Sequence, residues 1–178
     1  AHMMTIDKTQ GVHFAVWAPN ALRVSVVGDF NHWDGRRHQM RRLWDSGIFE
    51  IFVPGACEGQ NYKYELKLKN GLTYLKADPY GNRTQPAPLW NSVVADVSDF
   101  TWNDSSWMAE RKKYDDRRQP VSIYETSLGQ WESGKELVTF AKEKGYTHVE
   151  LHPVMEFLED GSDGYPTSAY FAVSTRYG

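Results

Sequence analysis

The alternation of apolar and polar residues predicts that the first hundred residues form short β-strands. In residues 62–69, tyrosine or leucine fills every second position, and lysine or glutamate fills the positions between. This period of two is typical of a strand with one buried face. Asn70-Gly71 follows and favours a type I′ hairpin turn. The other expected strands are residues 14–17, 23–27, 48–53, 72–75 and 92–97.

The hydrophobic period changes after Pro120. Residues 121–125 and 147–152 have the length and composition of strands. Between them, Ser133 and Glu136 have the spacing of a helix capping box, and an apolar helical stripe follows at residues 137–141. Gly145 stands where a helix commonly ends. A strand, a helix and a strand joined by short links predict a parallel pair with a right-handed crossover.

These patterns divide the chain into four parts. Residues 1–4 resemble an expression scar and are left out of the predicted fold. Residues 5–102 are expected to form a β-sandwich of the immunoglobulin-like kind, because short strands follow one another with turn residues between them. Residues 103–120 form a highly charged linker of balanced sign. Residues 121–178 are expected to form β/α units. Because the sandwich is the largest part, the predicted fold class is mainly β.

Composition and charge exclude several classes of partner. The chain has 178 residues and a net charge of −3. It therefore lacks the excess positive charge with which proteins bind nucleic acid or an anionic membrane. No apolar run approaches the length of about 18 residues that spans a bilayer. The single cysteine excludes an internal disulfide and fits a reducing compartment, so we expect a cytoplasmic protein. Seven Trp, ten Tyr and eight Phe weakly favour a carbohydrate ligand.

Candidate chemistry lies in the turn-rich loop that follows the strand at residues 23–27. Gly, Asp and Asn favour turns there, and the loop also contains Phe30 and Trp33. A flat ring beside Asn31 suits a sugar, because the ring meets the C–H face and the amide meets the hydroxyls. The alternative is that both aromatic side chains point inward and fill the loop, since aromatic residues dominate core burial.

Nine motifs in a fixed order resemble the glycogen and starch branching enzymes of the α-amylase superfamily. The resemblance covers nearly the whole chain from Gly11. The motifs are residues 11–20 (GVHFAVWAPN), 26–36 (VVGDFNHWDGR), 62–65 (YKYE), 76–80 (KADPY), 122–125 (SIYE), 128–131 (LGQW), 147–154 (THVELHPV), 164–172 (GYPTSAYFA) and 176–178 (RYG).

The resemblance implies a glycogen-binding-type sandwich followed by the first units of a truncated (β/α)₈ catalytic barrel. It implies the N-terminal portion of a 1,4-α-glucan branching enzyme, which moves a cut α-1,4-glucan segment to an α-1,6 position. In that family the two catalytic carboxylates come from later barrel strands, so the 178 residues contain none and are predicted inactive alone. The alternatives are a stand-alone α-glucan-binding module, or the N-terminus of an isoamylase or maltooligosyl-trehalose hydrolase. No metal or cofactor is implied.

Five residues are predicted to contact substrate. The resemblance places Tyr165 beneath the glucose at the cleavage point. It places Trp33 and Lys63 in the sugar site of the sandwich, with Tyr74 as a second flat ring, and Asn31 lies beside Trp33. Packing of Trp33 against the barrel is the alternative.

Three other polar residues are less attractive candidates. Glu125 is better explained as a structural strand-end group than as a catalytic carboxylate. His148 and His152 face one side of a strand, but no further metal ligand follows at useful spacing.

The expected partner is an α-glucan such as glycogen, starch or a maltooligosaccharide. Residues 121–178 expose a strand edge that the rest of a barrel would cover. This part is therefore expected to be mobile, to pack on the sandwich, or to self-associate.

Overall fold

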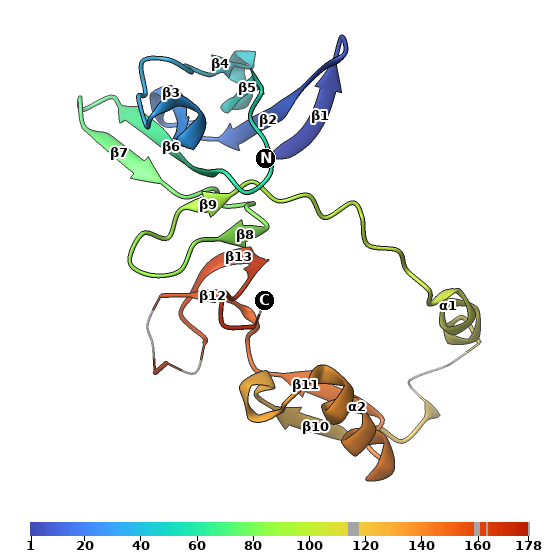
Figure 1. The fold of residues 1–178 in the computed structure, drawn as a ribbon. Helices are drawn as coiled ribbons and strands as arrows, with labels where there is room; N and C mark the ends of the chain where they lie inside the picture. Colours follow the sequence, from blue (N-terminus) through green and yellow to red (C-terminus); the bar gives the residue numbers. More distant parts are fainter. Residues whose placement is uncertain (114–117, 159–160, 163, 178) are drawn as a thin grey trace.

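The N-terminal half contains two antiparallel sheets (Figure 1). The computed structural model of the protein describes residues 1–113, 118–158, 161–162 and 164–177. The first sheet has the order β1-β2-β5-β4, with β1 (His2–Ile6), β2 (Thr9–Trp17), β5 (Ile48–Pro54) and β4 (Arg41–Arg42). The second has the order β3-β6-β9-β8, with β7 also paired to β6; its strands are β3 (Ala21–Gly28), β6 (Asn61–Leu68), β7 (Thr73–Lys76), β8 (Arg83–Thr84) and β9 (Ser92–Val93).

One apolar core lies between the sheets. Alternate residues of each strand turn inward, so β2 contributes Val12, Phe14 and Val16, and β6 contributes Tyr62 and Tyr64. Strands β3 and β5 add Val24, Val26, Phe49 and Val53 to the same cluster. The predicted mainly-β fold is therefore confirmed, and both sheets contribute to a single core.

The β6–β7 hairpin is confirmed, but its turn differs from the predicted type. Only Gly71 has a positive φ, at 84°, whereas a type I′ turn also needs one at Asn70. Leu68 N–H donates to Leu72 O, which leaves a three-residue loop with glycine in the left-handed position. Asn70 Oδ1 accepts the N–H of Leu72, so the side chain replaces a backbone acceptor.

Two boundaries also differ from the predicted ones. His2 and Met3, set aside as a scar, lie in β1, where His2 pairs with His13 and Met3 with Val12. Strand β9 is much shorter than residues 92–97, because its ladder partners on β6 are only Asn61 and Tyr62.

The second half contains a parallel strand pair and a capped helix. Strand β10 (Ile123–Thr126) pairs in parallel with β11 (His148–Leu151), and α2 (Gly134–Glu143) connects them. Ser133 Oγ accepts the N–H of Glu136, as predicted, whereas the Glu136 carboxylate reaches the N–H of Glu132. The helix ends before Gly145, whose φ is 82°.

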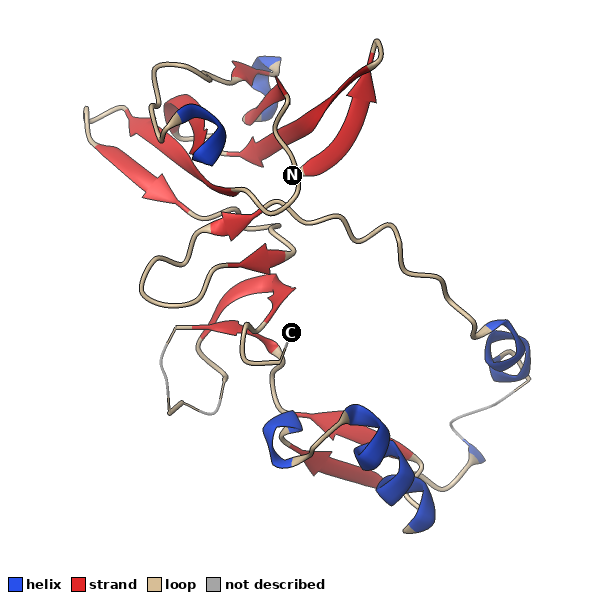
Figure 2. Cartoon of the chain, viewed as in Figure 1, coloured by secondary structure: helices blue, strands red, loops and turns tan. Residues whose placement is uncertain are grey.

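The charged segment contains the short helix α1 (Ser105–Arg111). Residues 114–117 of the predicted linker lie outside the described residues. The helices and strands of the whole chain are coloured in Figure 2. None of the helices within the described ranges has the length and apolar character needed to cross a membrane.

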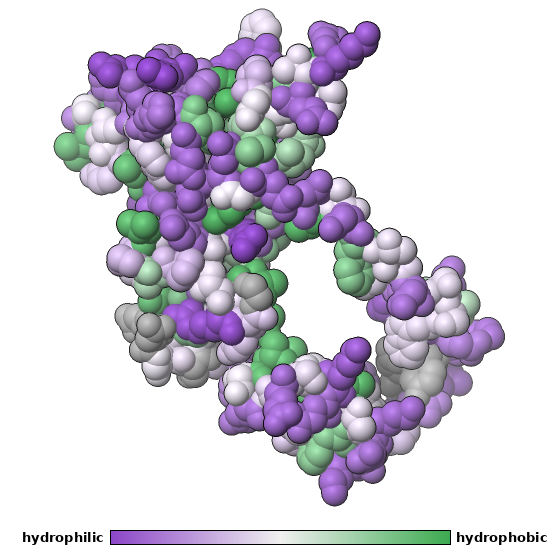
Figure 3. All heavy atoms as spheres, viewed as in Figure 1, coloured by the Kyte–Doolittle hydropathy of each residue, from purple (hydrophilic) through white to green (hydrophobic). Residues whose placement is uncertain are grey.

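A C-terminal hairpin connects the second half to the sandwich. Strands β12 (Met155–Phe157) and β13 (Thr167–Val173) are antiparallel, and β13 lies beside β8 (Figure 1). The Phe171 ring stacks on Tyr80 with centroids 5.0 Å apart. This hairpin packs on the sandwich, whereas the β10–β11–α2 unit stands apart, and the space-filling view shows an opening beside the linker (Figure 3).

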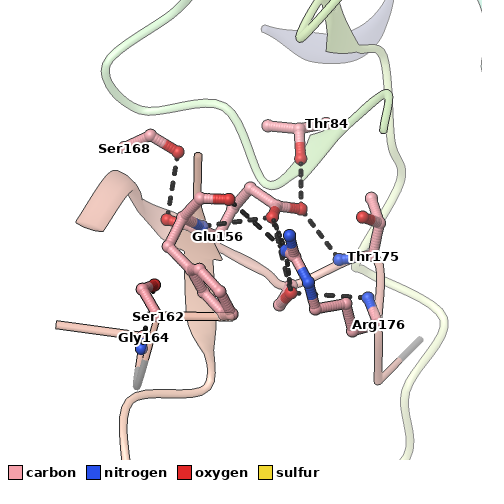
Figure 4. Close-up of polar contacts among 9 residues, drawn as sticks. Thr84, Glu156, Ser162, Gly164, Ser168, Thr175 and Arg176 are labelled. Carbon is pink, nitrogen blue, oxygen red and sulfur yellow. Dashed lines mark hydrogen bonds and ion pairs between the residues drawn. The ribbon is translucent and has the colours of Figure 1, made fainter. Parts of the chain in front are cut away.

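Glu156 is the buried polar centre of this connection (Figure 4). Its Oε2 accepts from Thr84 Oγ1 of the sandwich at 3.0 Å and from Thr175 N at 2.8 Å. Its Oε1 accepts from Arg176 Nη1 at 2.9 Å. Burial raises the pKa of Glu156, but the hydrogen bonds to the carboxylate outweigh it and hold the pKa below its usual value. The joint therefore contains an ionised carboxylate.

Candidate functional site: a cleft beside Trp33

The loop that carries Trp33 begins where β3 meets β6. A one-turn 3-10 helix, η1 (Asp29–Asn31), starts directly after Gly28. A Cβ atom on residue 28 would stand 2.3 Å from Asn61 O, so only glycine allows the strand and loop to approach this closely. The next two residues after η1, His32 and Trp33, both have left-handed φ values, of 56° and 61°.

Left-handed backbone at two successive non-glycine residues costs about 1–2 kcal/mol per residue. Hydrogen bonds stabilise it in this loop. Trp33 N–H donates to Gly28 O at 3.0 Å, and Trp33 Nε1 donates to Asp29 Oδ1 at 3.2 Å. Asp29 Oδ2 in turn accepts from the backbone N–H of Asn61 at 2.8 Å and from its side-chain Nδ2 at 3.0 Å. The indole is thus held to the sheet, while 36% of the residue surface stays exposed.

The Trp33 ring forms one wall of a surface cleft of about 420 Å³, which we call the Trp33 cleft. Its apolar walls are Trp33, Leu75 and Leu89. Its polar groups are Asp29, Asn61, Lys63, Gln85 and Asn91. The structure therefore brings Trp33 and Lys63 together, as the resemblance implied.

Internal hydrogen bonds fix the polar groups of the Trp33 cleft. Lys63 Nζ donates to Leu89 O at 2.8 Å, which ties β6 to the loop before β9. Asn91 Nδ2 donates to Gln85 Oε1 at 2.8 Å, and Gln85 N–H donates to Asn91 O. The cleft thus combines pre-positioned donors and acceptors with apolar walls.

Strand register places Leu75, not Tyr74, in the cleft. Tyr74 pairs with Leu66, whose side chain packs against the core, and Leu75 pairs with Glu65 on the outward face that also carries Lys63. Successive side chains of a strand point to opposite faces. Tyr74 is 43% exposed, but it lies on the other side of its sheet and does not line the cleft. Its predicted contact with ligand in this cleft is not supported.

Asn31 also does not reach the cleft. It is fully buried, and its amide serves the loop itself. Asn31 Oδ1 accepts from Gly28 N–H at 3.0 Å, and Nδ2 donates to Val26 O at 2.9 Å. Its predicted hydroxyl-binding role is therefore replaced by a structural one.

The cleft residues missed by the sequence analysis had weak or no signals. Asn61 and Leu75 stand at outward positions of strands, in phase with Lys63, and strict use of the alternation identifies them. Asp29 lies four residues before Trp33. The loop residues Gln85, Leu89 and Asn91 carry no local pattern, because tertiary folding alone brings them to Trp33.

A second group of predicted residues meets at the carboxyl ends of β10 and β11. His152 Nε2 lies 3.4 Å from Glu125 Oε1. The rings of His152 and Tyr165 have centroids 6.3 Å apart, and Tyr165 is 60% exposed. Among the described residues, no group of three or more His, Cys, Asp or Glu side chains is placed to hold a metal ion.

The Trp33 cleft suits a neutral hydroxyl-rich ligand. The indole and leucine side chains offer apolar contact to the C–H face of a sugar, and carboxylate, amide and ammonium groups offer both acceptors and donors to hydroxyls. One carboxylate and one ammonium group balance in charge.

A family model matches most of the sandwich. Residues 2–81 match the family model of carbohydrate-binding module 48, described as the isoamylase N-terminal domain. These residues include β1 to β7 and carry Trp33, Lys63 and Leu75.

Curated relatives match over the whole chain. A 1,4-alpha-glucan branching enzyme GlgB of Synechococcus sp. is 45% identical, with 100% of this chain and 27% of the relative aligned. A protein of the same name from Rhodospirillum rubrum is 47% identical, with 100% of this chain and 26% of the relative aligned. The chain spans about a quarter of the length of these relatives, and the resemblance drawn from the motifs is confirmed.

A solved structure shows the same fold. A crystal structure from Salmonella typhimurium, described as a candidate alpha amylase, superposes with a TM-score of 0.72 at 22% identity. It covers 99% of this chain, which corresponds to 28% of that one.

Proposed function

We propose that the Trp33 cleft binds an α-glucan chain. The observation that carries the proposal is the convergence of Trp33 and Lys63, both within the segment that matches a carbohydrate-binding family model, on one cleft. Asn91, which follows that segment in the sequence, lines the same cleft. Glucose residues stack on the exposed indole face, and Lys63 and the Gln85–Asn91 pair bind hydroxyls. The strained backbone at Trp33 supports this role, since strain of this kind clusters at binding sites.

We further propose that the chain is the N-terminal part of a 1,4-α-glucan branching enzyme. Its relatives carry that name, and it aligns with about a quarter of their length. In this proposal, residues 121–178 begin a (β/α)₈ barrel, because β10, α2 and β11 form one parallel β/α unit. The barrel's later strands supply the nucleophile and the acid/base, so this chain alone has no transferase activity.

Tyr165 is proposed as a sugar platform of that catalytic centre. Its ring lies at the carboxyl ends of parallel strands, where the active sites of (β/α)₈ enzymes are found. The His152 ring lies beside it, and Glu125 pairs with His152. We place the enzyme in the cytoplasm, with the rest of the barrel covering the exposed edges of β10 and β11.

Electrophoresis in gels that contain glycogen tests the binding proposal. The unaltered chain is expected to be retarded, and Trp33→Ala to lose most of the retardation. Trp44→Ala is the matched control, because Trp44 is 92% exposed in the turn η2 (Trp44–Ser46) and lies outside the cleft. Equal retardation of Trp33→Ala and the unaltered chain would contradict the proposal and assign Trp33 to a protein interface.

A further inference from the structure

The outer face of the first sheet carries a groove of about 480 Å³. Register places five of its lining residues, Met4, His13, Arg41, Glu50 and Phe52, on the outer side: Met4 pairs with Gly11, His13 with Phe52, and Arg41 with Glu50. Their neighbours Val12, Phe49 and Val53 point into the core. The groove therefore lies on the side of the sandwich opposite the Trp33 cleft, whose residues Lys63 and Leu75 point outward from the second sheet.

We propose that this groove, which we call the Phe52 groove, is a second α-glucan subsite, so that the sandwich holds two glucan segments at once. The ligand class rests on the proposed function of the Trp33 cleft. The argument for this location comes from the groove's own residues.

Phe52 supplies the flat apolar surface. A Cβ on Gly11 would stand 2.7 Å from Phe52 Cζ and 2.9 Å from Cε2, so the ring lies against bare backbone. Met4 and Ile6 stand along the same groove, each 42% exposed. A ring supported on one side by backbone and open to a groove on the other offers its face to the C–H side of a sugar.

Glu50 supplies the acceptor. Arg41 Nη2 donates to Glu50 Oε1, and His13 Nε2 lies 3.3 Å from Glu50 Oε2. The Arg41 hydrogen bond holds the pKa of Glu50 below its usual value, so the group is ionised at neutral pH. A carboxylate has about four lone-pair sites, and these two contacts leave room for ligand hydroxyls.

Arg41 supplies donors and balances the charge. Its guanidinium has five N–H groups, and its side chain is 75% exposed. One ionised carboxylate beside one guanidinium gives no net charge, which disfavours an anion or a cation as ligand. An aromatic face, a carboxylate and a multiple donor within one groove suit a neutral polyhydroxylated ring, the same chemistry as in the Trp33 cleft.

Two subsites on opposite faces have a measurable consequence. A short oligosaccharide binds each independently, whereas branched glycogen presents many chains to both. Two-point binding can raise the apparent affinity by about 100-fold over one site, and it cross-links particles.

The test is titration of the isotope-labelled chain with maltoheptaose, followed by backbone amide shifts. The unaltered chain should show two shifted patches, one around Asn61 and Lys63 and one around His13 and Phe52. Trp33→Ala should lose the first patch and keep the second. Phe52→Ala should lose the second patch and keep the first. The milder Arg41→Gln, which changes only an exposed side chain, should have the same effect. On glycogen, each single variant should bind about 100-fold more weakly and cease to cause turbidity.

The outcomes separate the two proposals. Loss of every shift in Trp33→Ala would overturn the Phe52 groove and leave the Trp33 cleft standing. Shifts confined to the Phe52 groove in the unaltered chain would support the groove and overturn the cleft. Unchanged shifts near His13 in both Phe52→Ala and Arg41→Gln would also contradict the groove.

Discussion

Asn31 Nδ2 lies 2.9 Å from His38 Nδ1 inside the loop that presents Trp33. The amide nitrogen is a donor only, so Nδ1 of His38 must accept, and the imidazole must be neutral. Burial lowers the pKa of His38, and the neighbouring Arg37 lowers it further. A histidine held neutral therefore supports the geometry of the proposed glucan cleft.

The first prediction concerns acid sensitivity. Because the folded-state pKa of His38 lies below its unfolded value of about 6.5, the unfolded chain binds the proton more tightly. The stability that the neutral ring provides is complete above pH 6.5 and is lost as pH falls below it toward the folded pKa. The midpoint of thermal unfolding should therefore decrease from pH 7 to pH 5. His38→Gln, which keeps an acceptor and cannot titrate, should flatten that decrease.

Equal pH dependence in His38→Gln and the unaltered chain would show that other groups cause the loss. Glu156 and Asp34 do not compete in this window, because their unfolded pKa values, 4.5 and 3.8, already lie below pH 5 and their folded pKa values are lower still. The side-chain hydrogen bond from Arg36 leads in lowering the pKa of Asp34 to about 2.

The second prediction concerns Gly28. A methyl group at this position meets Asn61 O at 2.3 Å, so Gly28→Ala should push the loop off β6. We expect a loss of about 1–3 kcal/mol in unfolding free energy and weaker glucan binding. Gly134→Ala is the matched control, since nothing lies within 4 Å of its added Cβ and α2 begins there. It should be neutral or stabilise by up to about 1 kcal/mol. Denaturant titration of both variants checks this, and an equal effect would refute the steric argument.

Much of the fold follows from local pattern. The alternation in residues 62–69 predicted β6, and its turn residues predicted the hairpin with β7. The capping pair Ser133 and Glu136 marked the start of α2. The turn type was wrong because Asn70 used its side chain as an acceptor instead of adopting a positive φ.

The site was less predictable, for physical reasons. Trp33 was identified from its turn-rich loop and Lys63 through the resemblance, and both line the cleft. Tyr74 was chosen because the resemblance places a second flat ring near it, although a shift of one residue along a strand decides which face a side chain occupies. Asn31 was chosen as a neighbour of Trp33. Its amide points inward instead, because the buried Gly28 N–H and Val26 C=O groups need hydrogen-bond partners. Gln85, Leu89 and Asn91 required the tertiary structure.

The third prediction concerns the connection between the sandwich and the C-terminal hairpin. Glu156→Gln removes the charge that faces Arg176 and weakens the acceptor for Thr84 and Thr175. Removing one partner of a buried ion pair costs about 3 kcal/mol. Glu110→Gln, which affects only the exposed pair with Lys113, should cost less than about 0.5 kcal/mol. Hydrogen exchange should show early opening of β12 and β13 in Glu156→Gln; unchanged protection there would contradict the prediction.

The fourth prediction separates the sandwich from the barrel. In a complete enzyme with this sequence, Tyr165→Ala should lower turnover by at least about 100-fold and leave glycogen retardation unchanged, because Tyr165 does not line the Trp33 cleft. Turnover near the unaltered level would remove Tyr165 from the catalytic centre.

The central claim is that a glucan chain contacts the Trp33 ring, and the seven tryptophan indole N–H signals of the chain test it most directly. The Trp33 signal is identified by its absence in Trp33→Phe. During titration with maltoheptaose, we predict a saturable shift of that signal, while the signal of the exposed Trp44 stays unchanged. A Trp33 signal that does not move at saturating maltoheptaose would contradict the account.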